Sequence, residues 1–141
     1  MNILLIEDNP GDARLAQEAF TRSRAALNLH IAFDGEDAMD FLRRRGIHTN
    51  APRPDLIVLD LNLPKLDGRE TLKQIKQDRN FKAIPIVILT QSDMEADIRY
   101  CYENYANCYF VKPAQWDAFG EIVKHINEVW LGLARLPDIN G

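Results

Sequence analysis

Three acidic side chains follow apolar runs at positions where their carboxylates could act together. Glu7 and Asp8 come directly after the run at 3–6, and Asp60 comes directly after the run at 56–59. Short apolar runs bounded by turn residues predict strands that are buried on both faces. In open parallel sheets, binding sites lie in the crevice beyond the carboxyl ends of the strands. We therefore expect the three carboxylates to meet at one edge of a sheet.

A metal site is the first chemistry that these carboxylates suggest, because crowded negative charges repel one another. All-oxygen ligands select a hard cation such as Mg²⁺, which usually takes one or two carboxylates and keeps several waters. The backbone carbonyl of Asn62 is a further candidate ligand beside Glu7, Asp8 and Asp60. The alternative is that the acidic pair only begins a helix, where it favours the dipole and Pro10 fits the first turn. The nearby Asp60 favours the metal site.

Thr90 and Lys112 end two further apolar runs and add groups that can bind a phosphoryl oxygen. The threonine hydroxyl can donate a hydrogen bond, and the lysine ammonium is a compact point charge. Each residue taken alone is explained at least as well as a strand-ending threonine or a surface lysine. Pro113 permits a cis peptide bond that would aim Lys112 over the pocket. With Mg²⁺, this set is suited to forming an aspartyl phosphate on Asp60.

Alternating apolar and amphipathic stretches must position these groups. The apolar runs predict strands at 3–6, 27–33, 56–59, 84–89 and 108–111. Amphipathic stretches predict helices at 11–24, 36–46, 67–79, 94–106 and 115–134. This order predicts a doubly wound α/β fold, a flavodoxin-like five-stranded parallel sheet with helices on both faces. Right-handed crossovers bring the first, third and fourth strands side by side.

The last amphipathic stretch has the clearest helical period. Its apolar residues recur at spacings of three and four, namely Trp116, Phe119, Ile122, Val123, Ile126, Val129, Trp130 and Leu133. Such a stripe could line a cofactor groove, but packing against the sheet is the commoner role.

Composition and charge are those of an ordinary globular domain, with 46% hydrophobic residues and a net charge of −4. The charge argues against non-specific binding to nucleic acid or an anionic membrane. No apolar stretch approaches the roughly 20 residues of a membrane helix, and none resembles a signal-peptide core. Cys101 and Cys108 fit no disulfide scaffold or zinc spacing, so we expect free thiols in a reducing cytoplasm. We expect one domain over 1–141, with a short tail at 135–141 and no effector domain.

Taken together and in order, these elements resemble the receiver domains of two-component response regulators. The resemblance runs from Met1 to about Leu133 and rests on Glu7-Asp8, Asp60 with Pro64 and Gly68, Thr90, Tyr109 and Lys112-Pro113. The segment 61–70 and the end at Trp130-Leu131 also resemble the small single-domain regulators paired with cyanobacterial phytochromes.

The resemblance implies a non-enzymatic phosphorelay protein with Asp60 as the phosphoacceptor. A sensor histidine kinase, in this subgroup a phytochrome, would donate the phosphoryl group. Mg²⁺ would be bound by Asp8, Asp60 and the Asn62 carbonyl, with Glu7 acting through water. Glu7 stands where aspartate is commoner in the family, which lengthens its reach to the metal.

The resemblance also implies a two-state switch. Lys112 would pair with the phosphoryl group, Thr90 would move toward it, and the Tyr109 ring would swing inward. Gln91 stands where the family usually has a small residue. We expect it to slow hydrolysis of the phosphate, and a phosphate half-life of seconds would contradict this.

Tyrosines are dense in the fourth predicted helix and its end, at positions 100, 102 and 105. Tyrosine is favoured at interfaces, and with the family likeness this suggests a homodimer through the fourth helix, fifth strand and fifth helix. Tyrosines lying over the edge of the core, with their hydroxyls in water, explain the pattern about as well.

Three rival functions follow from the same residues. A haloacid-dehalogenase-like phosphatase needs a second acid two residues after its nucleophile, where this chain has Asn62. A flavodoxin-like flavin protein needs a glycine- or hydroxyl-rich phosphate loop instead of Glu7-Asp8. A pseudo-receiver that never takes phosphate conflicts with a pocket that looks complete. The histidines at 30, 48 and 125 lie outside the predicted pocket and are expected to be non-catalytic.

Overall fold

Five parallel strands form one sheet in the order β2-β1-β3-β4-β5. The strands are β1 (Asn2–Ile6), β2 (Asn28–Ala32), β3 (Leu56–Leu59), β4 (Ile86–Thr90) and β5 (Cys108–Val111). The structure is a computed structural model that describes residues 1–22 and 27–138, apart from the side chain of Trp116. The predicted parallel sheet is confirmed, with the first, third and fourth strands adjacent.

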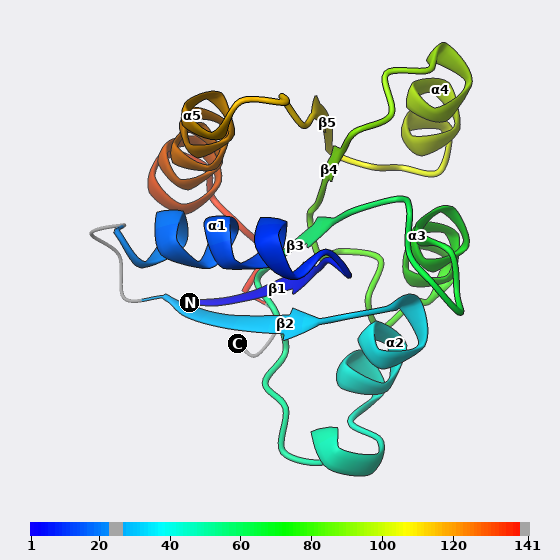
Figure 1. The fold of residues 1–141 in the computed structure, drawn as a ribbon. Helices are drawn as coiled ribbons and strands as arrows, with labels where there is room; N and C mark the ends of the chain where they lie inside the picture. Colours follow the sequence, from blue (N-terminus) through cyan, green and yellow to red (C-terminus); the bar gives the residue numbers. More distant parts are fainter. Residues whose placement is uncertain (23–26, 139–141) are drawn as a thin grey trace.

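Helices cover both faces of the sheet (Figure 1). One face carries α1 (Pro10–Thr21) and α5 (Trp116–Ile126). The other carries α2 (Gly35–Arg43), α3 (Gly68–Gln77) and α4 (Glu95–Glu103), with a short 3-10 turn at Gly46–His48 after α2. None of the described helices is long and apolar enough to cross a membrane.

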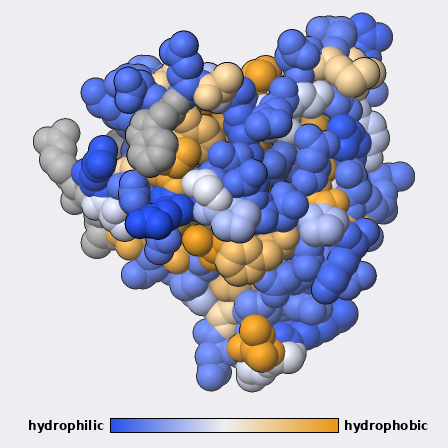
Figure 2. Space-filling view, viewed as in Figure 1, coloured by the Kyte–Doolittle hydropathy of each residue, from blue (hydrophilic) through white to orange (hydrophobic). Residues whose placement is uncertain are grey.

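Alternating side chains of the strands supply two separate apolar cores. In β1, Leu4 and Ile6 join the core under α2, α3 and α4, whereas Ile3 and Leu5 join the core under α1 and α5. This period of two, with both faces buried, explains why the strands are continuous apolar runs. The outer surface seen in Figure 2 is largely hydrophilic, with apolar areas mainly where β2 forms the edge of the sheet.

Several predicted boundaries needed correction for local reasons. The helix expected at 36–46 ends at Arg43 because Arg44 adopts a left-handed conformation, with φ of 57°. The strand expected from 84 begins only at Ile86, directly after Pro85, which has no N–H to donate to the sheet. Positions 23 and 24, at the end of the helix expected at 11–24, lie outside the described residues.

The apolar stripe of the last helix is only partly buried. Phe119, Val123 and Ile126 are in the core, but Val129 is 47% exposed and Leu133 is 81% exposed. The α-helix ends at Ile126 and continues as a π-helical segment, Asn127–Leu133. Because a π-helix has wider turns, spacings of three and four no longer keep side chains on one face. The expectation of one core-facing stripe to position 133 was therefore wrong beyond Ile126, except that Trp130 still packs against the core.

Candidate functional site

The sheet hydrogen bonds continue one residue past the strands and fix the polar residues at one edge. The backbone N–H of Asp60 donates to the Ile6 carbonyl at 3.0 Å, which places Asp60 beside Glu7. The backbone N–H of Lys112 donates to the Thr90 carbonyl at 2.7 Å. The parallel register itself therefore brings four of the predicted site residues, Glu7, Asp60, Thr90 and Lys112, to the same edge.

The acidic cluster forms as expected. One carboxylate oxygen from each of Glu7, Asp8 and Asp60 lies within 4.8 Å of the others. Glu7 is 3% exposed and Asp60 is 6% exposed, whereas Asp8 is exposed to solvent. Burial and the charge of Asp60 raise the pKa of Glu7 to about 7, in spite of the neighbouring Lys112. Crowded oxygens of this kind fit a hard divalent cation, which would relieve their repulsion.

The start of α1 is provided by residues other than the acidic pair. Asn9 is the N-cap, and its side-chain oxygen accepts from the backbone N–H of Asp12 at 3.0 Å. Pro10 follows as the first helical residue. Asp8 is thus not needed as the helix cap, which weakens the alternative explanation for the acidic pair.

Lys112 places its ammonium group among three carboxylates of the pocket. Its ammonium group donates to Asp60 Oδ2 at 3.0 Å, to Asp12 Oδ2 at 2.9 Å and to Glu7 Oε2. Burial alone would lower the pKa of Lys112, but the three carboxylates outweigh this effect and raise it. The lysine reaches the pocket across a trans bond to Pro113, because the peptide bonds described include no cis bond. The permitted cis bond was therefore a wrong expectation, since the register of β5 suffices to aim the side chain.

Asp12 is the one pocket residue that sequence reasoning missed. An acid in the first turn of a helix is readily explained by the helix dipole, so it gives no separate signal. Asp12 shares Lys112 with Asp60 and Glu7.

Thr90 presents an unpaired hydroxyl. The residue is fully buried, and its Oγ1 has no hydrogen-bond partner. Leaving a buried hydroxyl unsatisfied costs about 1–3 kcal/mol, so such groups need an explanation. An oxygen acceptor delivered to the neighbouring pocket, such as a phosphoryl group, would satisfy it.

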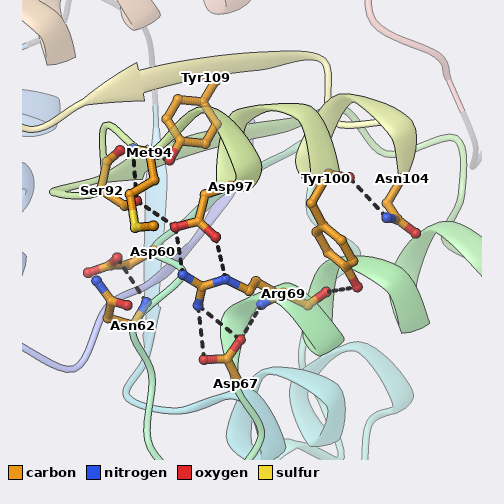
Figure 3. A network of polar contacts seen from close by, with 10 residues as sticks. All are labelled: Asp60, Asn62, Asp67, Arg69, Ser92, Met94, Asp97, Tyr100, Asn104 and Tyr109. Carbon is orange, nitrogen blue, oxygen red and sulfur yellow. Dashed lines mark hydrogen bonds and ion pairs between the residues drawn. The ribbon is translucent and has the colours of Figure 1, made fainter.

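The loop after β3 packs directly on the backbone of Asp60. The backbone N–H of Asn62 donates to Asp60 Oδ1 at 3.2 Å (Figure 3). A Cβ at Gly68 would come within 2.2 Å of the Asp60 carbonyl oxygen, so only glycine fits there. The use of the Asn62 carbonyl as a metal ligand stays a prediction.

The remaining candidate residues lie where their ordinary roles predict. Tyr109 is partly buried, and its hydroxyl donates to the Ser92 carbonyl at 2.7 Å; its inward swing stays a prediction. The two cysteines are free thiols. The three histidines are engaged elsewhere, with Asn2, Asp37 and Glu128.

Comparison with known proteins identifies the family. Residues 3–126 match the response regulator receiver domain. The chain belongs to this family. Phosphoryl acceptance in two-component signalling, which the sequence predicted, is therefore its function.

Individual relatives agree with this assignment. Response regulator Rcp1 of Synechocystis sp. is 46% identical over 135 residues, which cover 96% of this chain and 92% of Rcp1. A crystal structure of the Mn²⁺-bound form of Rcp1 matches with a TM-score of 0.93, covering 96% of this chain and 98% of that one. The phosphorylated cyanobacterial phytochrome response regulator RcpA matches at 48% identity with a TM-score of 0.94, covering 97% and 98% of the two chains.

Proposed function

We propose that Asp60 accepts a phosphoryl group from the phosphohistidine of a sensor histidine kinase. The observation that carries this proposal is the placement of the Lys112 ammonium 3.0 Å from Asp60 Oδ2, inside a cluster of carboxylates. An Asp60 oxygen would form the new bond to phosphorus as the bond from phosphorus to the histidine nitrogen breaks. Lys112 would then stabilise the negative charge on the phosphoryl oxygens, and the free hydroxyl of Thr90 would donate to one of them.

Mg²⁺ is the proposed cofactor. Glu7, Asp8 and Asp60 provide the carboxylate oxygens, and the Asn62 carbonyl would add a backbone ligand. When bound, the ion would neutralise charge on the phosphoryl oxygens. The Mn²⁺ in the related Rcp1 structure supports a divalent cation, and the oxygen-only ligand set favours Mg²⁺.

The proposed kinase partner is of the phytochrome type, because RcpA is a phytochrome response regulator. We place the exchange in the cytoplasm, where Cys101 and Cys108 would stay reduced. The signal would leave this receiver domain through protein contacts rather than by chemical turnover. Slow loss of the phosphate, expected from Gln91, belongs to the same proposal.

We also propose that the surface formed by α4, β5 and α5 passes on the signal by forming a homodimer. On α4, β5 and the loops at the ends of α4, several apolar or aromatic side chains are exposed: Met94 at 63%, Tyr102 at 49%, Tyr105 at 74% and Val111 at 40%. Aromatic side chains and Met are enriched at interfaces. Sedimentation at tens of micromolar, with and without phosphorylation, tests this; a monomer in both conditions would remove the dimer.

Intact mass tests the phosphoacceptor after incubation with acetyl phosphate and Mg²⁺. We expect a gain of one phosphoryl group that is lost in Asp60→Asn and without Mg²⁺. Asp117→Asn, which removes an exposed carboxylate from α5, is the matched control and should still gain the mass. No gain in the wild type, with acetyl phosphate or with a histidine kinase, would favour the pseudo-receiver instead.

A further inference from the structure

Helix α4 is held to the domain by very little apolar packing. Cys101 is its one buried residue, Tyr100 packs against the core only partly buried, and the side chain of its N-cap residue Met94 makes no capping hydrogen bond. An element with few buried contacts opens or moves at low cost. Its position therefore depends in large part on the polar contacts that it makes.

The main polar contact is a two-pronged ion pair between α3 and α4. Arg69 Nε donates to Asp97 Oδ1 at 2.8 Å, and Arg69 Nη2 donates to Asp97 Oδ2 at 2.8 Å (Figure 3). The Asp97 side chain is 14% exposed and that of Arg69 is 31% exposed. Hydrogen bonds from Arg69 and Ser92 hold the pKa of Asp97 below its usual value. Paired, charge-assisted hydrogen bonds of this kind fix geometry as well as adding energy.

The ion pair also reaches the loop that leads out of the pocket. Ser92 lies two residues after Thr90, and its hydroxyl donates to Asp97 Oδ2. The Ser92 carbonyl in turn accepts the hydrogen bond from Tyr109 at 2.7 Å. Asp97 thus ties the loop and the tyrosine to the start of α4.

On the other side, Arg69 is anchored next to the phosphoacceptor. Asp67 accepts from the backbone N–H of Arg69 at 2.9 Å and from its guanidinium at 3.3 Å. Gly68, between these two residues, packs on the backbone of Asp60. The contacts therefore form a chain from the Asp60 backbone, through Arg69 and Asp97, to the loop after Thr90.

We propose that the Arg69–Asp97 ion pair is a latch that holds the loop 91–94 and the start of α4 in the resting arrangement. The inference rests on the proposed function of Asp60. A Thr90 hydroxyl drawn toward a phosphoryl group pulls on Ser92, and the loop cannot follow while Asp97 is clamped by Arg69. A contact that exists only in the resting state opposes the switch, so its removal raises the population of the active state.

The test measures how tightly Mg²⁺ and beryllofluoride, a mimic of a phosphoryl group on a carboxylate, bind to latch variants. We expect Arg69→Gln and Asp97→Asn each to lower the dissociation constant by about five- to tenfold, a usual size for coupling between sites. Because both substitutions remove the same interaction, the double variant should bind beryllofluoride no more tightly than the tighter-binding single variant. Arg14→Gln is the matched control, since it removes an exposed pair with Glu18 at 3.4 Å and should leave the constant unchanged.

A second measurement is made on the free variants and separates the latch from simple destabilisation. In NMR spectra of the free proteins, the Ser92 and Tyr109 amide signals of Arg69→Gln should shift toward their positions in the beryllofluoride-bound wild type. Arg69→Lys keeps the positive charge but loses the two-pronged hydrogen bonding of the guanidinium. Its amide signals should therefore lie between those of wild type and Arg69→Gln.

Two results would overturn the latch. Wild type that binds beryllofluoride while Arg69→Gln behaves like Arg14→Gln would refute the latch alone. Wild type that fails to bind beryllofluoride at all would refute the proposed function of Asp60 and the latch with it.

Discussion

Helices α3 and α4 border the same pocket but are held in opposite ways. Helix α3 buries Leu72 and Ile75, and its N-cap residue Asp67 accepts a hydrogen bond from the backbone N–H of Arg69. Its last turn is tied down as well, because the Lys76 ammonium donates to the Ile84 carbonyl at 2.9 Å. Helix α4 buries only Cys101 and depends on polar contacts. The difference indicates that α3 is fixed mainly by apolar packing, whereas the position of α4 depends more on its polar contacts.

The largest effect on stability is expected from disrupting the packing of α3. Leu72→Ala removes a fully buried side chain and should lower the free energy of unfolding by about 2–5 kcal/mol. Tyr102 lies on α4 and is 49% exposed, so Tyr102→Ala should change the free energy of unfolding by no more than about 0.5 kcal/mol. Urea denaturation measures both values. Equal losses in the two variants would show that α4 is packed as firmly as α3.

A smaller effect is expected in how the free energy of unfolding depends on pH through Lys76, at the end of α3. Burial lowers the pKa of Lys76 to about 8, whereas an unfolded lysine has a pKa of about 10.4. Between these values the unfolded chain binds more protons, so this group makes the free energy of unfolding rise with pH, by at most about 1.4 kcal/mol per unit. The difference in stability between wild type and Lys76→Met should therefore grow in favour of wild type from pH 8 to 10. A difference that stays constant across this range would contradict the burial of the ammonium group.

The smallest effect is expected from adding an N-terminal capping side chain to α4. Met94 is 63% exposed and has the extended backbone of an N-cap, but it offers no capping oxygen. Met94→Ser should stabilise the protein by about 0.5–1 kcal/mol, because serine can accept from the first turn. Met94→Ala is the control and should give no gain. Thermal unfolding of the two variants makes the comparison, and equal stability would mean that α4 is already capped by other means.

Most of the fold could be predicted because its three central strands are buried on both faces and even the partly exposed edge strand β5 is a continuous apolar run. The runs at 56–59 and 108–111 match β3 and β5 in full. The end of the last helix could not be predicted, since the change to a π-helix after Ile126 leaves the three-and-four spacing of the sequence intact. Periodicity shows where a regular helix would bury its side chains, not where its backbone departs from regularity.

In the site, residues at strand ends were predictable and residues on helices were not. Glu7, Asp60 and Lys112 follow strands, and parallel strands bring their carboxyl ends to one edge. Asp12 and the Arg69–Asp97 pair lie on three different helices. Their meeting depends on how those helices pack, which leaves no pattern in a single sequence.

Hydrogen–deuterium exchange with and without phosphorylation tests most directly whether phosphorylation of Asp60 moves only one side of the pocket. Wild type would be treated with acetyl phosphate and Mg²⁺ beside Asp60→Asn as the reference. We expect exchange to change in residues 91–103, which cover the loop and α4, and to stay constant in α3 at 70–77. No change in 91–103, an equal change in α3, or the same response in Asp60→Asn would contradict a switch driven from Asp60 through α4.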